Sequence, residues 1–578
     1  SKQSNKATRR VLAGVLCGAS VLSLVLSLVM PPISQAIAND VQTVPTEETV
    51  MGGGSSSEST DVDNTNNGDT EKLNSGETEG DEVGDESQPE EQPEEEQQNE
   101  GTTTSDGETV AAVAENEQTE AAAEGIDEAS ELKNKLESVA ENQSGSFQLM
   151  KDLDCNEEII LNKSGSNITL DLNGFKIKYS SNNNKSLFNV SNSAEFTITD
   201  SHPGEDNIAG SQPLQDQDHN LIADNCGKTA KMRYENDVPT ELTYYVTKSS
   251  VDTKDSTRTN ETTYEHKVTI KGAIVACSSS KVNLIKLNGG TFNLQGGVLT
   301  QQNNRNVDGL IYAQNGSVYM SGGYVCGASM GSSGAGAGIR VEGSTLDEGS
   351  TLEISGGVIA GNYAPSGGGV YAKNSTVYMV GGIISGNGTN DYQSGYGAGI
   401  CAENSNVTIT GGYITNNRYQ HYVNQEGNTK HLGNGCHGGG GIAAFSQFEG
   451  QKKGSLVICG GYITGNYSAE AGGGVYAGAW NKPLSGFTFS DGIIASNVAQ
   501  NSEGGGIRIA APTVGDFNVS GKKAYITNNT TNTTFDWGGG GVFVQGGNND
   551  KNIDSASLKI YNALITNNSA QGYGGGFA

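Results

Sequence analysis

Residues 358–387 read VIAGNYAPSGGGVYAKNSTVYMVGGIISGN, and this stretch decides the fold. It opens and closes on related phrases, VIAGN and IISGN, each with branched residues, small residues and a final asparagine. Between them lie a glycine cluster leading into VYAK and an alternating segment, TVYM, that ends in Gly-Gly. Because these segments are too short for helices and alternate apolar with polar residues, the unit predicts three short strands.

The asparagine phrase recurs through the second half of the chain at intervals of 25, 30, 49, 31, 32 and 39 residues. A repeat of about 30 residues with three strands fits one coil of a parallel β-helix, whose coils pair about 4.8 Å apart. We therefore predict an all-β fold, a right-handed single-stranded parallel β-helix over residues 146–578. Its stacked core is expected to hold Val370, Ala372, Val377 and Met379.

The recurring asparagines form a column in this arrangement. Side-chain amides at a turn can bond the neighbouring backbone and one another up a stack. We interpret the column as structural rather than catalytic. Its members are Asn362, Asn387, Asn417, Asn466, Asn497, Asn529 and Asn568.

The composition is uneven along the 578 residues, which carry a net charge of −31 and 82 glycines. Residues 39–130 hold 28 acidic residues and one cation, Lys72. This segment has too few apolar residues for their burial to offset the entropy lost when a chain becomes ordered. We therefore predict a disordered acidic linker over 39–126. The acidic balance also argues against nucleic acid as a partner.

The first 38 residues resemble a signal peptide for secretion. Four cations precede an apolar run over 11–30, and Ala36-Ile37-Ala38 provides a small-x-small cleavage site. We predict signal removal after residue 38 and no later membrane span; an uncleaved anchor is the alternative. The mature protein is then secreted, extracellular or attached to a cell surface.

Three further segments complete the predicted organisation. Ala129, Leu132, Leu136 and Val139 lie at helical spacing, so 127–145 is expected to hold a capping helix over the first coil. Residues 203–264 interrupt the repeat and are expected to form an insertion from an early coil. The chain stops at Ala578 within an incomplete coil, and we expect its C-terminus to be truncated there.

The late repeats resemble a known family. Asn497-Val498-Ala499 leads to a Gly-Gly-Gly-Ile phrase, and Asn568-Ser569-Ala570 leads to Gly-Gly-Gly-Phe. Both are similar to polymorphic outer-membrane-protein-type repeats, and the wider resemblance is to pectate-lyase-like β-helix proteins of bacterial surfaces. The phrase ITLDLNG at 168–174 is similar to the start of such β-helices. This resemblance implies adhesion or surface display, and it carries over no catalytic residues.

Aromatic and arginine residues are the candidate ligand-binding groups. One column of the glycine-led strand is expected to face solvent, and the variable loops add further aromatic residues. Aromatic faces and arginine forks suit stacking on sugars and bonding to hydroxyls; the alternative is that these rings pack under the loops. The candidates are Tyr371, Tyr476, Arg508, Tyr467, Trp537 and Tyr573.

Metal and cofactor signals are weak. His421, His431, Cys436 and His437 are transition-metal ligand types in one long loop, but their spacing fits no zinc pattern, and a polar loop without metal is the alternative. We expect no cofactor; single carboxylates such as Asp391 and Asp536 could bind calcium. The seven cysteines after the signal show no disulfide framework.

Three functions remain open from the sequence. The first is a secreted or surface-displayed adhesin or glycan-binding scaffold, a monomer whose partners are glycans or surface proteins of host or neighbouring cells. The second is a polysaccharide lyase or glycoside hydrolase on the same fold, although no paired carboxylates recur on aligned positions. The third is a structural stalk, since fold alone does not choose among them.

Overall fold

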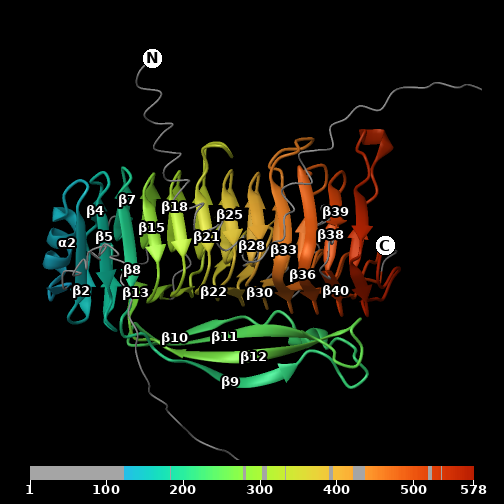
Figure 1. Ribbon diagram of the computed structural model, residues 1–578, viewed down its shortest axis with the longest axis horizontal. Helices are drawn as coiled ribbons and strands as arrows, with labels where there is room; N and C mark the ends of the chain where they lie inside the picture. Colours follow the sequence, from blue (N-terminus) through green and yellow to red (C-terminus); the bar gives the residue numbers. More distant parts are fainter. Residues whose placement is uncertain are drawn as a thin grey trace, which may run out of the picture. The chain divides into compact units, whose positions relative to one another are not determined.

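The structure is a computed structural model that describes residues 123–181, 184–277, 282–302, 309–331, 334–389, 395–420, 437–518, 524–534 and 537–578. The predicted signal peptide and nearly all of the predicted linker lie outside the described residues. From residue 123 onward, successive coils stack through parallel strand pairing, which confirms the predicted parallel β-helix (Figure 1).

Two faces of the solenoid are joined into one 23-stranded sheet within the described residues, because β33 and β36 run continuously through both. The first face carries the alternating segment of each repeat, as in the TVYM strand. Its strands are β1 (Glu124–Ile126), β2 (Ser144–Leu149), β5 (Asn167–Asp171), β8 (Glu195–Thr199), β15 (Thr291–Leu294), β18 (Ser317–Met320), β21 (Thr351–Ile354), β25 (Thr376–Met379), β29 (Asn406–Ile409), β33 (Ser455–Thr464), β36 (Gly486–Ala495), β39 (Val514–Asn518) and β43 (Ser557–Tyr561).

The second face carries the strand that precedes each asparagine. Besides the second halves of β33 and β36, its strands are β3 (Leu153–Cys155), β6 (Lys176–Tyr179), β13 (Ala273–Ala276), β16 (Val298–Gln301), β19 (Tyr324–Cys326), β22 (Val358–Ala360), β26 (Ile383–Ser385), β30 (Tyr413–Thr415), β40 (Ala524–Thr527) and β44 (Leu564–Thr566).

The third face is an 11-stranded sheet of the strands that follow the glycine clusters. They are β4 (Ile159–Leu161), β7 (Phe188–Ser191), β14 (Ile285–Asn288), β17 (Ile311–Gln314), β20 (Ile339–Glu342), β24 (Val370–Lys373), β28 (Ile400–Glu403), β32 (Ile442–Phe445), β35 (Val475–Ala477), β38 (Ile507–Ile509) and β42 (Val542–Val544).

Two-residue strands after the asparagines form a fourth, narrow, seven-stranded sheet. They are β23 (Tyr363–Ala364), β27 (Gly388–Thr389), β31 (Arg418–Tyr419), β34 (Tyr467–Ser468), β37 (Val498–Ala499), β41 (Thr530–Thr531) and β45 (Ser569–Ala570).

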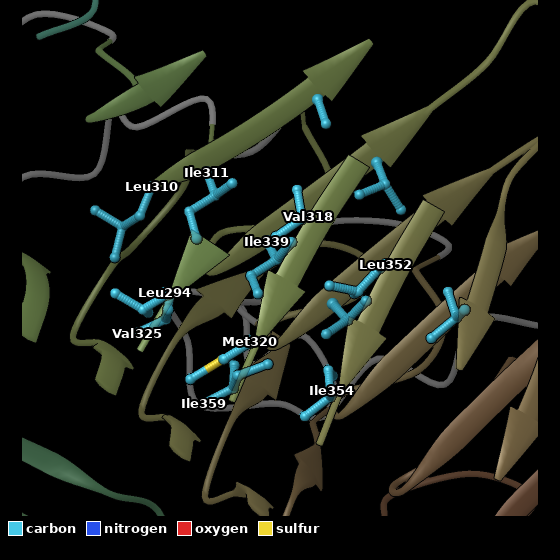
Figure 2. Packing of buried hydrophobic residues seen from close by; sticks show 14 of the residues in the cluster. Leu294, Leu310, Ile311, Val318, Met320, Val325, Ile339, Leu352, Ile354 and Ile359 are labelled. Carbon is cyan, nitrogen blue, oxygen red and sulfur yellow. The ribbon is translucent and has the colours of Figure 1, made fainter. Parts of the chain in front are cut away.

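The core is a continuous stack of apolar side chains between the first three faces. Val370, Ala372, Val377 and Met379 are fully buried, as predicted, and pair in register with equivalent residues of neighbouring coils. Figure 2 shows this packing, with Leu352, Ile354 and Ile359 of one coil beside Val318, Met320 and Val325 of the preceding coil. Each buried aliphatic side chain stabilises the fold by about 1.5–3 kcal/mol.

Glycine pairs turn the chain from the first face to the second. Gly382 adopts φ +75°, and a Cβ there would lie 2.8 Å from the carbonyl oxygen of Gly356 in the coil before. Both the positive φ and the close backbone approach require glycine at this corner.

The asparagine column forms a ladder of hydrogen bonds along the stack. The Asn417 side chain donates to Oδ1 of Asn466 (3.0 Å) and to the carbonyl of Ile384 (2.9 Å). Its own Oδ1 accepts from the backbone N–H (3.1 Å) and the side-chain amide (3.0 Å) of Asn387. Asn362, Asn466, Asn497, Asn529 and Asn568 take part in the same pattern. These buried polar bonds tie every coil from the sixth onward to the next.

Helix α2 (Ala129–Ser138) covers the open end of the first coil. Leu132 and Leu136 are fully buried and Val139 is nearly so, at the spacing expected from the sequence. The helix ends at Ser138, and β2 begins at Ser144 inside the segment predicted as helical. The helix therefore covers apolar core side chains at this end of the solenoid.

The segment between β8 and β13 folds as a separate four-stranded antiparallel sheet, which we call the insertion sheet. It contains β9 (Asp206–Pro213), β10 (Lys231–Glu235), β11 (Val238–Val251) and β12 (Thr259–Thr269), with a short 3-10 helix, η1 (Ala223–Asn225). Because β12 continues to Thr269, the insertion runs past the end predicted at residue 264.

The insertion sheet lies along the second face and reaches the last coils (Figure 1). The part of the sheet over the earlier coils packs through apolar residues, including Leu242 and Val246, against Cys326 and Ala360. The part over the later coils is held by polar contacts. The Glu261 carboxylate accepts from Ser496 Oγ (2.8 Å) and Asn528 Nδ2 (2.8 Å). An insertion that leaves the solenoid at an early coil is therefore fixed at its distal end.

Substituting Asn417→Ala should destabilise the solenoid strongly. The change leaves the Ile384 carbonyl and the Asn387 amide buried without these bonds, at about 1–3 kcal/mol for each group. Urea unfolding should show a loss of about 3–5 kcal/mol in the free energy of unfolding. Asn207→Ala, at an exposed position of β9, is the control and should change it by less than about 0.5 kcal/mol. Equal effects of the two variants would contradict a role for the ladder in stability.

Candidate functional site

The outward column of the third face is buried from Tyr371 to Arg508, which corrects the expectation that it faces solvent. Tyr371 is 6% exposed, and Tyr476 and Arg508 are fully buried. Strand alternation does direct these side chains away from the core. However, residues of neighbouring segments cover them: the Tyr396 ring lies 4.4 Å from Phe445 and 5.8 Å from Tyr476, between ring centroids. These three candidates therefore pack inside the protein.

Arg508 belongs to a buried ion pair. Its Nε lies 2.7 Å from Oε1 of Glu503, and both side chains are almost completely buried. The guanidinium also lies 4.7 Å from the centroid of the Tyr476 ring. Burial acts to raise the pKa of Glu503, but the Arg508 charge and the Ser502 hydroxyl outweigh it and lower that pKa. The charge of Arg508 is thus used within the fold.

The other three aromatic candidates differ in their surroundings. Tyr467 lies under the Arg418 guanidinium (3.9 Å) and packs against Leu214 and Cys226 of the insertion. Trp537 and Tyr573 remain 45% and 66% exposed on neighbouring coils. These two side chains lie on the surface, several coils away from Tyr371.

The metal candidates stay largely outside the described residues. His421, His431 and Cys436 lie there, as do Asp391 and Asp536. His437 is described, and burial together with the Lys482 charge lowers its pKa to about 4. In the described ranges no three histidine, cysteine or acidic side chains cluster as a metal site requires. The six described cysteines form no disulfide.

Glu470 is a second, partly buried carboxyl group, close enough to Glu503 to interact with its charge. Burial, together with repulsion from Glu503, raises the pKa of Glu470 to about 7. Since Glu503 is already paired with Arg508, the two carboxylates differ in charge near neutral pH. The raised pKa of Glu470 should therefore make the stability of the protein depend on pH near neutrality.

An open cleft lies elsewhere, between the insertion sheet and the second face, and we call it the insertion cleft. Its volume is about 530 Å³, within the range of small-molecule sites. It crosses four coils, with Tyr324 and Tyr413 at its two ends and Val358 and Ile383 between them. The full lining is Asp206, Tyr244, Gly323, Tyr324, Gly357, Val358, Gly381, Gly382, Ile383, Gly412 and Tyr413.

Two outward columns of the second face create this cleft. In the four strands that line the cleft, the third residue is small and fully buried beneath the insertion sheet, as in Ala360 and Thr415. The first residue is larger, and it remains partly exposed in Tyr324, Ile383 and Tyr413. The glycine corners next to the first column carry no side chains that would fill the space. Tyr413 is also stacked on Tyr462 of the next coil, at 4.8 Å and 10° between rings.

Asp206 is held in place by three neighbours. It accepts a hydrogen bond from the Tyr244 hydroxyl (2.6 Å), and a longer one from the Tyr324 hydroxyl (3.5 Å). Its other oxygen lies 3.0 Å from Nδ1 of His266, which stacks on Tyr244 at 4.7 Å. Burial acts to raise the pKa of Asp206, but the hydrogen bonds from His266 and Tyr244 prevail and lower it. The cleft therefore presents a fixed, ionised carboxylate between aromatic side chains.

Sequence reasoning did not find this cleft. Asp206 and Tyr244 lie in the segment treated as a polar insertion, more than 70 residues before the strands that they face. The alternation of a large first residue and a small third residue in the second-face strands was a readable signal. A column of small outward residues indicates that another layer covers it.

Comparison with known proteins gives little further information. No family model matches the chain, and no curated protein matches its sequence. The repeats' resemblance to polymorphic outer-membrane-protein-type repeats thus has no family match behind it. Among solved structures, the chain is similar to the Gp54 tailspike of Acinetobacter baumannii bacteriophage AP22, determined in complex with A. baumannii capsular saccharide. Identity is 11%, the match covers 73% of this chain and 69% of the tailspike chain, and the TM-score is 0.18. A TM-score this low carries no argument, so the fold rests on the strand pairing described above.

No helix in the described part of the chain is long and apolar enough to cross a membrane. The apolar run over 11–30 lies outside that part.

Arg508→Met should destabilise the protein by about 3–5 kcal/mol, because it leaves the Glu503 carboxylate buried without its cation. Urea unfolding measures this loss. Adding Glu503→Gln to the same chain should recover much of it, since the uncompensated charge is then removed. A single variant as stable as wild type would contradict the structural role assigned to this pair.

Glu470→Gln should change how stability depends on pH. The folded state keeps Glu470 protonated up to about pH 7, whereas the ordinary value is 4.5, so folding binds protons between these values. The free energy of unfolding of the wild type should therefore fall as the pH rises through this interval.

In Glu470→Gln this contribution to the fall should disappear, and the variant should gain stability over wild type above about pH 7. Urea midpoints across the pH range provide the measurement, with Glu449→Gln at an exposed position as the control. If the free energy of unfolding depends on pH in the same way for the wild type and Glu470→Gln, then the titration of Glu470 does not contribute to stability.

Proposed function

We propose that this protein is a secreted or cell-surface β-helix scaffold that binds glycans in the insertion cleft. The observation that supports it most is the pairing of aromatic side chains with a positioned carboxylate in one open cleft. Sugar rings offer apolar faces that pack on tyrosine and hydroxyl groups that donate to a carboxylate. Tyr324, Tyr413 and Asp206 provide both kinds of contact.

The geometry of the cleft suits a chain of sugars rather than a single ring. The tyrosines at its two ends, Tyr324 and Tyr413, lie on β19 and β30, three coil steps apart, which corresponds to about 14 Å at the usual strand spacing. The glycine corners along this path leave the backbone accessible. A ligand with several rings can therefore contact both tyrosines and Asp206 at once.

The signal-like first 38 residues and the acidic linker support export and display at a distance from a surface. These remain parts of the proposal, as do the monomeric state and the identity of any host or neighbouring cell. The described lining of the cleft contains one carboxylate, Asp206. Glycosidases of the common type need two, so we do not propose hydrolysis in this cleft.

Tyr413→Ala and Tyr324→Ala should each weaken glycan binding by tenfold or more, about 1.4 kcal/mol, because each removes an aromatic contact at one end of the cleft. A glycan array with the full chain identifies ligands, and titration calorimetry then measures their affinities. Tyr378→Ala and Tyr319→Ala are matched controls, since these tyrosines are 42% and 39% exposed on the first face, outside the cleft.

Loss of binding in the control variants alone would place the site on the first face and contradict the proposal. A wild-type chain that binds no glycan on the array would favour the stalk instead.

A further inference from the structure

The insertion cleft has an unbalanced charge. Among its described lining residues Asp206 is the one charged side chain, and the others are tyrosines, branched aliphatic residues and glycines. His266 faces Asp206 from β12, behind the cleft. The next residue on that strand, Lys267, lies 3.5 Å from the Glu265 carboxylate. No lysine or arginine in the described lining is thus available to an acidic ligand.

Asp206 keeps capacity for a ligand. An ionised carboxylate offers about four acceptor positions, and the structure shows three contacts, from Tyr244, Tyr324 and His266. Its side chain is 29% exposed. The carboxylate can therefore accept one more hydrogen bond from a group inside the cleft.

From these observations we infer that the insertion cleft takes saccharides without acidic groups, and that Asp206 is the residue that determines this specificity. A hydroxyl or a protonated amine of the sugar donates to Asp206, whereas a uronate carboxylate in the same place is repelled by it. The inference rests on the proposed function and names the ligand class for that same cleft. Amine-bearing sugars are the preferred members of the class, because a hydrogen bond between two charged groups is stronger than one to a neutral donor.

A matched ligand series tests the inference. The array carries glucose, galactose and mannose oligomers, each in its neutral, amino and uronate form, and the full chain is applied in mildly acidic buffer so that most amines are protonated. Calorimetry then measures the best-bound backbone in all three forms. We expect the amino form to bind about tenfold more tightly than the neutral form, and the uronate form to bind at least about tenfold more weakly.

Asp206→Asn assigns the preference to this residue, because asparagine keeps one acceptor oxygen and removes the charge. In this variant the amino form should lose its tenfold advantage, and the uronate form should gain about tenfold in affinity. Glu353→Gln is the matched control, since Glu353 is a carboxylate between Tyr319 and Tyr378 on adjacent coils of the first face. It should leave all three affinities unchanged.

The outcomes separate the inference from the proposed function. If the wild type binds all three forms equally, or if Asp206→Asn keeps the amine preference, the inference is overturned while glycan binding stands. If no form of any backbone binds, the proposed function fails. If Asp206→Asn does not fold, the salt dependence of binding by the wild type tests the inference instead. Affinity for the amino form should fall with rising salt, while affinity for the neutral form stays constant. A constant affinity for both forms would overturn the inference.

Discussion

In-register stacking of coils is the constraint on which the rest of this structure depends. Each coil must place its strands directly beneath those of the next, so equivalent residues meet at every step. A side chain at a repeated position must therefore pack well against a side chain of the same type in the next coil. Aliphatic residues meet this condition through packing, and asparagine meets it because its amide carries both a donor and an acceptor. The Asn417–Asn466 bond repeats a geometry that any coil can continue.

Regular stacking also explains how one insertion can reach so far. The second face presents the same outward positions at every coil, so an extended sheet laid along it meets a uniform surface. Small third-position residues such as Ala360 let the sheet approach closely. At the distal end the contacts become polar, and the buried Glu261 carboxylate is satisfied by side chains that include Ser496 and Asn528. A buried charge that is fully bonded favours one alignment, because a shifted sheet would leave it without partners.

The sequence was sufficient for the fold but not for the site, and the difference has a physical origin. Periodicity predicts which way Val370 and Tyr371 point, and both point as predicted. Whether an outward residue meets water depends on segments that do not repeat, and those segments bury Tyr371, Tyr476 and Arg508. The insertion cleft was hidden for a related reason. Asp206 and Tyr244 come from the insertion, which does not repeat, whereas Tyr324 and Tyr413 come from the repeating coils, so their proximity is a property of the insertion sheet's alignment.

The same alignment fixes the position of the carboxylate in the cleft. Asp206 is the first residue of β9, yet its position is set by Tyr244 on β11 and His266 on β12, two other strands of the insertion sheet. Tyr324 adds a bond from the solenoid side. Since groups of the protein itself hold the carboxylate, the proposed binding would not have to order it, and preorganisation of this kind lowers the entropic cost of association. The packing of the insertion sheet on the coils thus positions Asp206, the one charged side chain in the described lining of the cleft.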